Sequence, residues 1–295
     1  MKVERYTIKN LRNEFGTQKK CLEYLWKQKY SLLKNCPHCG EDTKFYLIED
    51  KKRYVSSCGH SMFPTKGTIF YKSSTPLTLW FHTIYLFSVS KNGVSAKELE
   101  RQLGVTYKTA WRIANKIRSL MNESVKMVGG IVEMDETYIV GKEMNKHKDK
   151  KSLTGYSDKT VIVGMKSRDG KVVANVEDNT KKKTLFKNIY EHIEVNSLIM
   201  TDELPAYKDI EKDGYWKHAK INHSDKEYAR EDEINNVKIN ISTNGIENFW
   251  SVFKRGTKGT YIRLSKKWMQ SYVDEFTFRQ NNKDKVLFRE LIGRV

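Results

Sequence analysis

Three acidic residues that are far apart in the chain have the types and settings of metal-binding groups. Asp135 lies inside an apolar run, Asp202 directly follows a short apolar run, and Glu247 lies near the start of an amphipathic segment. Burying a carboxylate is costly unless it has a partner or a metal, and ligands gather at strand ends in α/β sheets. Together the three acids fit a ribonuclease-H-like sheet that gathers carboxylates around two divalent ions.

The first acid comes from the predicted strand 131–140. Period-two alternation places Glu133 and Asp135 on one face of this strand and Glu136 on the other. A salt bridge at Glu133 or Glu136 is the alternative interpretation of these acids.

The third acid comes from a predicted helix at 244–254. Glu247, Ser251 and Lys254 share one helical face, so a carboxylate and a basic group could hold a metal and a DNA phosphate side by side. The alternatives are structural: Glu247 completes a capping box with Asn244 as N-cap, and Asp202 is a turn residue before a proline.

A second set of residues suits zinc. Cys36 and Cys39 form a Cys-x-x-Cys knuckle, and Cys58 and His60 follow after a gap typical of a zinc ribbon. These four are the predicted ligands of a structural Zn²⁺, although Ser61 stands where a ribbon normally has its last cysteine. His38 is the competitor for the fourth position, and free or buried thiols are the alternative.

A third set is typical of DNA binding. Ser95 opens a helix that runs to Leu103, Gly104 and Val105 form a turn, and Thr106 caps a second helix through 118. A glycine turn followed by a basic helix is the pattern of a major-groove reader, with an ordinary helical hairpin as the alternative. The outer face of the second helix presents Tyr107, Lys108, Arg112 and Lys116.

Other segments must position these residues. We expect helices at 15–30, 76–89, 180–193 and 205–210, strands at 160–166, 171–176 and 198–201, and a linker at 123–130. The lysine-rich segment 142–151 is expected to be a solvated loop. His223 is a minor functional candidate, and Tyr261 either packs in the core or stacks on a base.

Composition excludes several classes of protein. The chain has 295 residues, 38% hydrophobic and 31% charged, which is not the composition of a disordered protein. Its formal net charge of +18 predicts a polyanionic partner, nucleic acid rather than membrane. The longest apolar stretch, 76–89, is too short to span a bilayer, and the chain start lacks a signal peptide.

These motifs, taken in order, resemble those of insertion-sequence DDE transposases of the ISXO2-like group, which carry an N-terminal zinc ribbon. The resemblance covers nearly the whole chain. Its carriers are CPHCG (36–40), SAKELERQLGVTYKTAWRIANKIR (95–118), VEMDETYIVGK (132–142), TDELPAY (201–207), NGIENFWSVFKRGTKGTYI (244–262) and DEFTFRQN (274–281).

The resemblance implies roles for particular residues. Asp135, Asp202 and Glu247 would be the three catalytic acids that hold two Mg²⁺ or Mn²⁺ ions. Lys254 matches the basic residue after the third acid and, with Arg255, would contact DNA. The basic stretch continues through Lys258, Arg263, Lys266 and Lys267.

The expected protein is therefore an α/β enzyme with a ribonuclease-H-like mixed sheet and flanking helices, preceded by a small zinc ribbon and a helix-turn-helix region. We expect four parts: an N-terminal helical segment (1–33), a zinc ribbon (34–72), a helix-turn-helix region (73–124) and a catalytic domain (125–295). It would be a homodimer or larger assembly on double-stranded DNA, both transposon ends and target, in the bacterial cytoplasm with the nucleoid. The alternatives are a DNA-binding regulator and a catalytically inactive transposase descendant.

Overall fold

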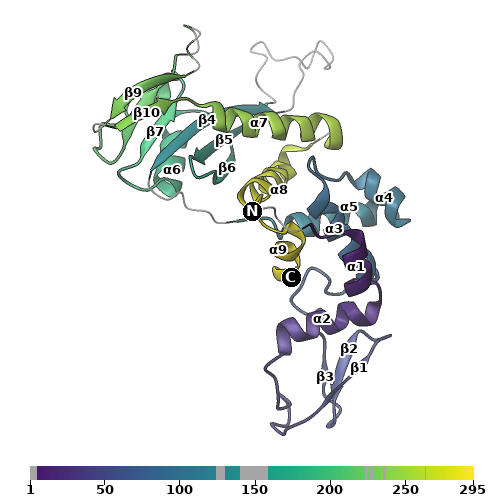
Figure 1. Cartoon of the computed structure of the whole chain (residues 1–295). Coiled ribbons are helices and arrows are strands. Elements are labelled where there is room, and N and C mark those ends of the chain that lie inside the picture. Colours follow the sequence, from purple (N-terminus) through teal and green to yellow (C-terminus); the bar gives the residue numbers. More distant parts are fainter. Residues whose placement is uncertain are drawn as a thin grey trace. The chain divides into compact units, whose positions relative to one another are not determined.

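The computed structural model describes residues 5–123, 130–139, 159–222, 225, 227, 229–234, 237–262 and 264–295. The chain divides into two compact units, of which the first joins Met1–Leu120 to Asp284–Val295 and the second is Met121–Lys283. Figure 1 labels the elements of both units. Most of the expected linker 123–130, all of the segment 142–151, His223 and Arg263 lie outside the described residues.

Aromatic packing holds the helices of the first unit together. The ring of Phe15 lies 4.6 Å from that of Phe81 and 5.8 Å from that of Phe288, between centroids. The helix expected at 15–30 is present, but it begins at Gln18, because Thr17 is its N-cap and accepts a hydrogen bond from the amide of Lys20. The helices of this core are α1 (Ile8–Phe15), α2 (Gln18–Tyr30), α3 (Leu77–Val89) and α9 (Leu287–Gly293).

A small antiparallel sheet lies between α2 and α3 in the sequence. Its strands are β1 (Phe45–Ile48), β2 (Arg53–Ser56) and β3 (Ser61–Met62), in the order β1-β2-β3. Trp26 of α2 stacks on Tyr54 of β2 with ring centroids 4.0 Å apart, which attaches the sheet to the helical core.

The helix pair expected at 95–118 is present as α4 (Ala96–Leu103) and α5 (Tyr107–Arg118). The Ser95 hydroxyl accepts from the Glu98 amide at 3.1 Å, and Thr106 plays the same part for α5. Gly104 ends α4 in the left-handed region, with φ of 63°, where a side chain would be strained. The inward face of α5 buries Ala110, Ile113, Ala114 and Ile117.

The second unit is a mixed α/β fold built on a five-stranded sheet in its described part, with the order β6-β5-β4-β7-β8. β5 lies antiparallel to β4 and β6, whereas β7 lies parallel to β4 and β8. The strands are β4 (Ile131–Ile139), β5 (Thr160–Ser167), β6 (Val172–Glu177), β7 (Leu198–Thr201) and β8 (Lys217–Lys220).

Helices cover both faces of this sheet. Leu185 and Ile189 of α6 (Lys182–His192) pack in one core with Val132 and Met134 of β4. The other face meets α7 (Asn244–Gly256) and α8 (Met269–Asn281) in a core that includes Ile139 and Trp250. Figure 1 shows α7 crossing β4 and β5. Alternation along β4 thus separates its side chains between two cores, as the sequence predicts.

Side chains of α8 close the outer edge of β6. The Gln270 side chain accepts from the Val176 amide at 2.7 Å and donates to the Ala174 carbonyl at 3.1 Å. The Asn281 side chain does the same for both backbone groups of Val172, at 2.7 and 2.9 Å. Two amide side chains therefore replace the hydrogen bonds that a neighbouring strand would make.

Several elements differ from the sequence predictions. The helix expected at 205–210 is a short 3₁₀ turn at Pro205–Tyr207. β8 and the hairpin of β9 (Arg230–Ile234) and β10 (Val237–Ile241) were not predicted. Charged residues dominate β8 and β9, whereas the alternation of Val237, Ile239 and Ile241 was an available signal for β10. Among the described helices, none has the length and apolarity needed to cross a bilayer.

Candidate active site

Two predicted acids meet where the carboxyl end of β7 reaches the middle of the neighbouring parallel strand β4. The register of β4 and β7 pairs Glu133 with Met200, and continuing it by two residues places Asp135 beside Asp202. β7 ends at Thr201, so Asp202 lies at its carboxyl end. This is the place where α/β sheets bind ligands.

Glu136 joins these two acids. Asp135, Glu136 and Asp202 each offer a carboxylate oxygen within 4.8 Å of the others. Asp135 faces α7, whereas Glu136 faces the opposite side of the sheet. Both side chains nevertheless come close to Asp202, because Asp202 follows the last residue of β7. Glu136 was not among the predicted site residues, although its position next to Asp135 was the available signal.

The electrostatics of the cluster reflect crowded negative charge. Burial, followed by the negative charges of Asp202 and Glu247, raises the pKa of Asp135 to about 6. The indole N–H of Trp250 opposes this rise by favouring the charged carboxylate, although it makes no hydrogen bond of normal geometry.

A buried tyrosine holds Glu136. The hydroxyl of Tyr207, which is 1% exposed, donates to the Glu136 carboxylate. Burial, with the charges of Asp202 and Asp135, raises the pKa of Glu136 to about 7, and the hydrogen bond from Tyr207 acts in the opposite direction. Burial also raises the pKa of Tyr207 well above its usual value, so this group stays a hydrogen-bond donor.

Asp202 also serves the local turn, as the structural alternative proposed. One of its carboxylate oxygens, Oδ1, accepts from the amide of Leu204 at 3.0 Å. The turn fixes the direction of the side chain at the end of β7, and membership of the acidic cluster shows that the two roles are compatible.

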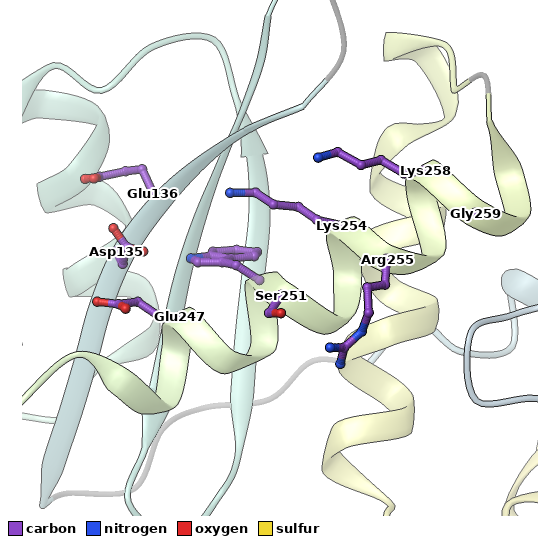
Figure 2. Close-up of a pocket in the computed structure, with 9 residues that line it drawn as sticks. Asp135, Glu136, Glu247, Ser251, Lys254, Arg255, Lys258 and Gly259 are labelled. Carbon is purple, nitrogen blue, oxygen red and sulfur yellow. The ribbon is translucent and has the colours of Figure 1, made fainter.

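Glu247 reaches the same cleft from α7. An open cleft of about 750 Å³ is lined at one end by Asp135, Glu136 and Glu247. Figure 2 shows Glu247 pointing to the same side as Asp135. Glu247 is not among the three acids whose oxygens come within 4.8 Å of one another. Two of the three predicted acids therefore belong to the tight cluster, and the third shares its cleft.

The other end of the cleft is basic. Ser251, Lys254 and Arg255 of α7 and Lys258 just beyond it line the cleft, at the helical spacing that the sequence predicted for this face. In Figure 2, Lys254 and Lys258 extend on the side of the carboxylates, whereas Arg255 points away. Tyr261 packs against the core and donates to Glu275 at 2.7 Å, which favours its structural interpretation.

Glu133 is salt-bridged, as one alternative proposed. Its carboxylate lies 3.3 Å from Nε of Arg168. The capping box with Asn244 is wrong, because the N-cap of α7 is Thr243, whose hydroxyl donates to Glu247 at 2.7 Å.

The acidic cluster fits a divalent metal ion. Its donors are hard carboxylate oxygens, which suit Mg²⁺ and Mn²⁺. Burial, together with repulsion between the neighbouring carboxylates, raises the pKa of Asp135 and Glu136, so both hold protons more tightly than usual. A divalent cation would stabilise the ionised forms of all three acids.

The cysteines form a second candidate metal site, in the first unit. The sulfur atoms of Cys36, Cys39 and Cys58 lie within 4.8 Å of one another. A hydrogen bond from Ser56 lowers the pKa of Cys36 to about 6, which favours the thiolate that zinc requires. The three-cysteine group includes neither His60 nor His38, whose rings stack on each other with centroids 5.4 Å apart.

The residues expected to read DNA differ in their surroundings. Lys108 is exposed on α5. Arg112 donates to the hydroxyls of Ser73 and Thr75, at 3.3 and 3.1 Å, and its guanidinium lies over the ring of Trp80. These contacts give Arg112 a structural role inside the first unit.

Comparison with known proteins agrees with this arrangement of residues. The family model described as the ISXO2-like transposase domain matches residues 127–281, which is just over half of the chain and includes Asp135, Asp202 and Glu247. The chain is also 21% identical, over 259 residues, to an uncharacterized protein in transposable element ISH50 of Halobacterium salinarum, covering 83% of this chain and 84% of that protein. The protein described here belongs to the ISXO2-like transposase family.

Proposed function

We propose that this protein binds the ends of its insertion sequence and catalyses metal-dependent DNA strand cleavage and strand transfer. The observation that carries the proposal is the convergence of Asp135, Glu136 and Asp202 where the carboxyl end of β7 reaches the middle of the parallel strand β4, with Glu247 in the same cleft. Membership of a transposase family supports DNA as the substrate.

In the proposed reaction, Asp135, Asp202 and Glu247 are the catalytic acids and Glu136 is an additional ligand. Two bound Mg²⁺ or Mn²⁺ ions would activate the attacking water or DNA 3′-hydroxyl and stabilise the departing oxygen during in-line attack on the phosphodiester. The acids orient the reacting phosphate by holding its metal ions in one place. Lys254 and Lys258, at the basic end of the cleft, neutralise neighbouring phosphates of the strand.

We also propose the ribonuclease-H-like assignment for the catalytic domain at 125–295. A mixed sheet with helices on both faces, and acids gathered on its central strand β4 beside the end of β7, supports it. The last segment, Asp284–Val295, groups with the first unit, which does not alter the position of any proposed catalytic acid.

The amino-terminal parts would supply DNA binding. We propose a zinc ribbon at 34–72, held by Cys36, Cys39, Cys58 and His60, and a helix-turn-helix at 73–124 in which Lys108 contacts DNA. The N-terminal helical segment, 1–33, packs beside both. We propose a homodimer or larger assembly, since two ends are to be joined, and a location with the nucleoid in the bacterial cytoplasm, since the proposed substrate is DNA.

A nicking assay tests the proposal. The intact chain, a labelled terminal-repeat duplex and Mg²⁺ should give nicked product, and Asp135→Asn and Asp202→Asn should lose nicking while still binding the duplex. Asp209→Asn is the matched control, because this acid pairs with Lys182 and Lys212 at the surface of the same unit. Duplex binding without any metal-dependent nicking would instead indicate a regulator or an inactive descendant.

A further inference from the structure

The helix that carries Glu247 begins without a local cap. The first amides of a helix need acceptors, which the N-cap side chain usually supplies. The N-cap of α7, Thr243, makes no such bond, because its hydroxyl donates to the Glu247 carboxylate. An acceptor for these amides must come from elsewhere in the fold.

Glu133 of β4 is that acceptor. Its Oε2 accepts from the amide of Ile246, in the first turn of α7, at 2.8 Å across 113 residues of sequence. Glu133 is 3% exposed, so this bond is shielded from water. A carboxylate at a helix N-terminus also interacts favourably with the helix dipole.

The glycine at the second position of α7 permits this approach. A Cβ at Gly245 would lie 2.6 Å from Oε2 of Glu133, closer than such atoms approach. The Gly245 carbonyl in turn accepts from the Lys166 ammonium of β5 at 2.8 Å. The start of α7 is therefore in direct contact with both central strands.

Arg168 links the same carboxylate to the segment that leads into the helix. Its Nε lies 3.3 Å from Oε1 of Glu133, and its Nη2 donates to the Asn240 carbonyl at 3.0 Å and the Ser242 hydroxyl at 3.2 Å. The buried carboxylate of Glu133 is thereby ion-paired through Oε1 and hydrogen-bonded through Oε2, as a buried acid requires.

Glu133 and Asp135 leave the same strand on the same face, two residues apart. We propose that Glu133 is a positioning residue that, as the remote N-cap of α7, sets the place of Glu247 relative to Asp135. Loss of this bond lets the first turn of α7 move away from β4 and separates the third acid from the other two. The inference rests on the proposed function, because it concerns the affinity of that metal site.

Mn²⁺ affinity, measured on the full zinc-loaded chain without DNA, tests the inference. In Glu133→Ala, Mn²⁺ should bind about 10- to 100-fold more weakly than in wild type, the range for groups that orient metal ligands. Glu133→Gln keeps an acceptor oxygen and should bind more tightly than Glu133→Ala. Gly245→Ala keeps every charge, but its Cβ displaces the Glu133 carboxylate. It should therefore weaken Mn²⁺ binding as much as Glu133→Ala does. If Glu133→Ala does not fold, Gly245→Ala serves as the test.

Glu275→Gln is the matched control. Glu275 is also a buried acid paired with an arginine, Arg279 at 2.8 Å, but it lies on α8, and its removal should leave Mn²⁺ affinity unchanged. Wild-type affinity in both Glu133→Ala and Gly245→Ala, or equal weakening in Glu275→Gln, would overturn the inference. Equal Mn²⁺ binding by wild type and Asp135→Asn would overturn the proposed metal site itself, and the inference with it.

Discussion

Asp135 lies directly opposite Gly164 in the antiparallel pair of β4 and β5. The missing side chain of Gly164 leaves the space that the ring of Trp250 fills, since a Cβ there would lie 2.4 Å from Cζ2 of the indole. Trp250 is 3% exposed and lines the cleft beside Asp135. The packing of α7 beside Asp135 therefore depends on this small residue.

Gly164→Ala should destabilise the second unit by about 1–3 kcal/mol, the usual cost of overpacking a core. Chemical denaturation of the full chain measures this change. Gly259→Ala is the control, because a Cβ at Gly259 has nothing within 4 Å and should change the free energy of unfolding very little. Equal stability of the two variants would contradict the assigned packing.

The acidic cluster should make stability depend on pH when no Mg²⁺ or Mn²⁺ is added. Asp135 and Glu136 bind protons more tightly in the folded protein than in the unfolded chain. Their contribution to stability is therefore full below about pH 4 and is lost as the pH rises through about 6 and about 7. The melting temperature of the zinc-loaded protein should fall over this range.

Added Mn²⁺ should reverse that fall at the upper end of the range, because it binds only the folded, ionised cluster. Glu136→Gln should flatten the pH dependence, since the amide has no proton to release. A pH profile in Glu136→Gln that matches the wild type would show that this residue does not cause the effect.

Lys108 and Arg112 should respond differently to removal of their side chains. Lys108→Ala should weaken DNA binding and reduce the salt dependence of log K by about 0.9 for each phosphate that the lysine neutralises. Arg112→Ala should instead lower the melting temperature of the first unit, because it removes the hydrogen bonds to Ser73 and Thr75. If Arg112→Ala keeps the wild-type melting temperature but binds DNA more weakly, Arg112 contacts DNA and the structural role is wrong.

The cysteine cluster should hold one zinc ion per chain, and Cys36→Ser should lose it. Since metal binding and folding are coupled in such sites, the small sheet should unfold with the loss. Zinc content of the purified protein measures the first effect. His60→Ala and His38→Ala, compared side by side, identify the fourth ligand as the histidine whose removal lowers zinc affinity.

Apolar runs made the central parts of the fold predictable. β4, β7 and α7 each carry an apolar or amphipathic pattern, and each was expected within a few residues of its observed bounds. Such runs must be buried somewhere, so their acids were visible as exceptions to the pattern. Asp135 and Asp202 could be selected for this reason.

Contacts between distant segments were not predictable in the same way. The bond between Glu133 and Ile246 joins residues that no local pattern connects, so the sequence indicated an N-cap at Asn244 instead. The period-two pattern correctly placed Glu136 on the face of β4 opposite to Asp135. That both side chains nevertheless come close to Asp202 follows from the position of the end of β7, which the pattern of β4 does not contain. Polar strands such as 230–234 owe their structure to pairing rather than to their own pattern.

The amide side chains of Gln270 and Asn281 limit how copies of this protein can assemble. Their hydrogen bonds occupy backbone groups of β6 that an incoming strand would need. Intermolecular sheet extension is thus blocked on that border, which also protects the enzyme from aggregating through it. An assembly of several copies would therefore form through surfaces other than this edge of β6.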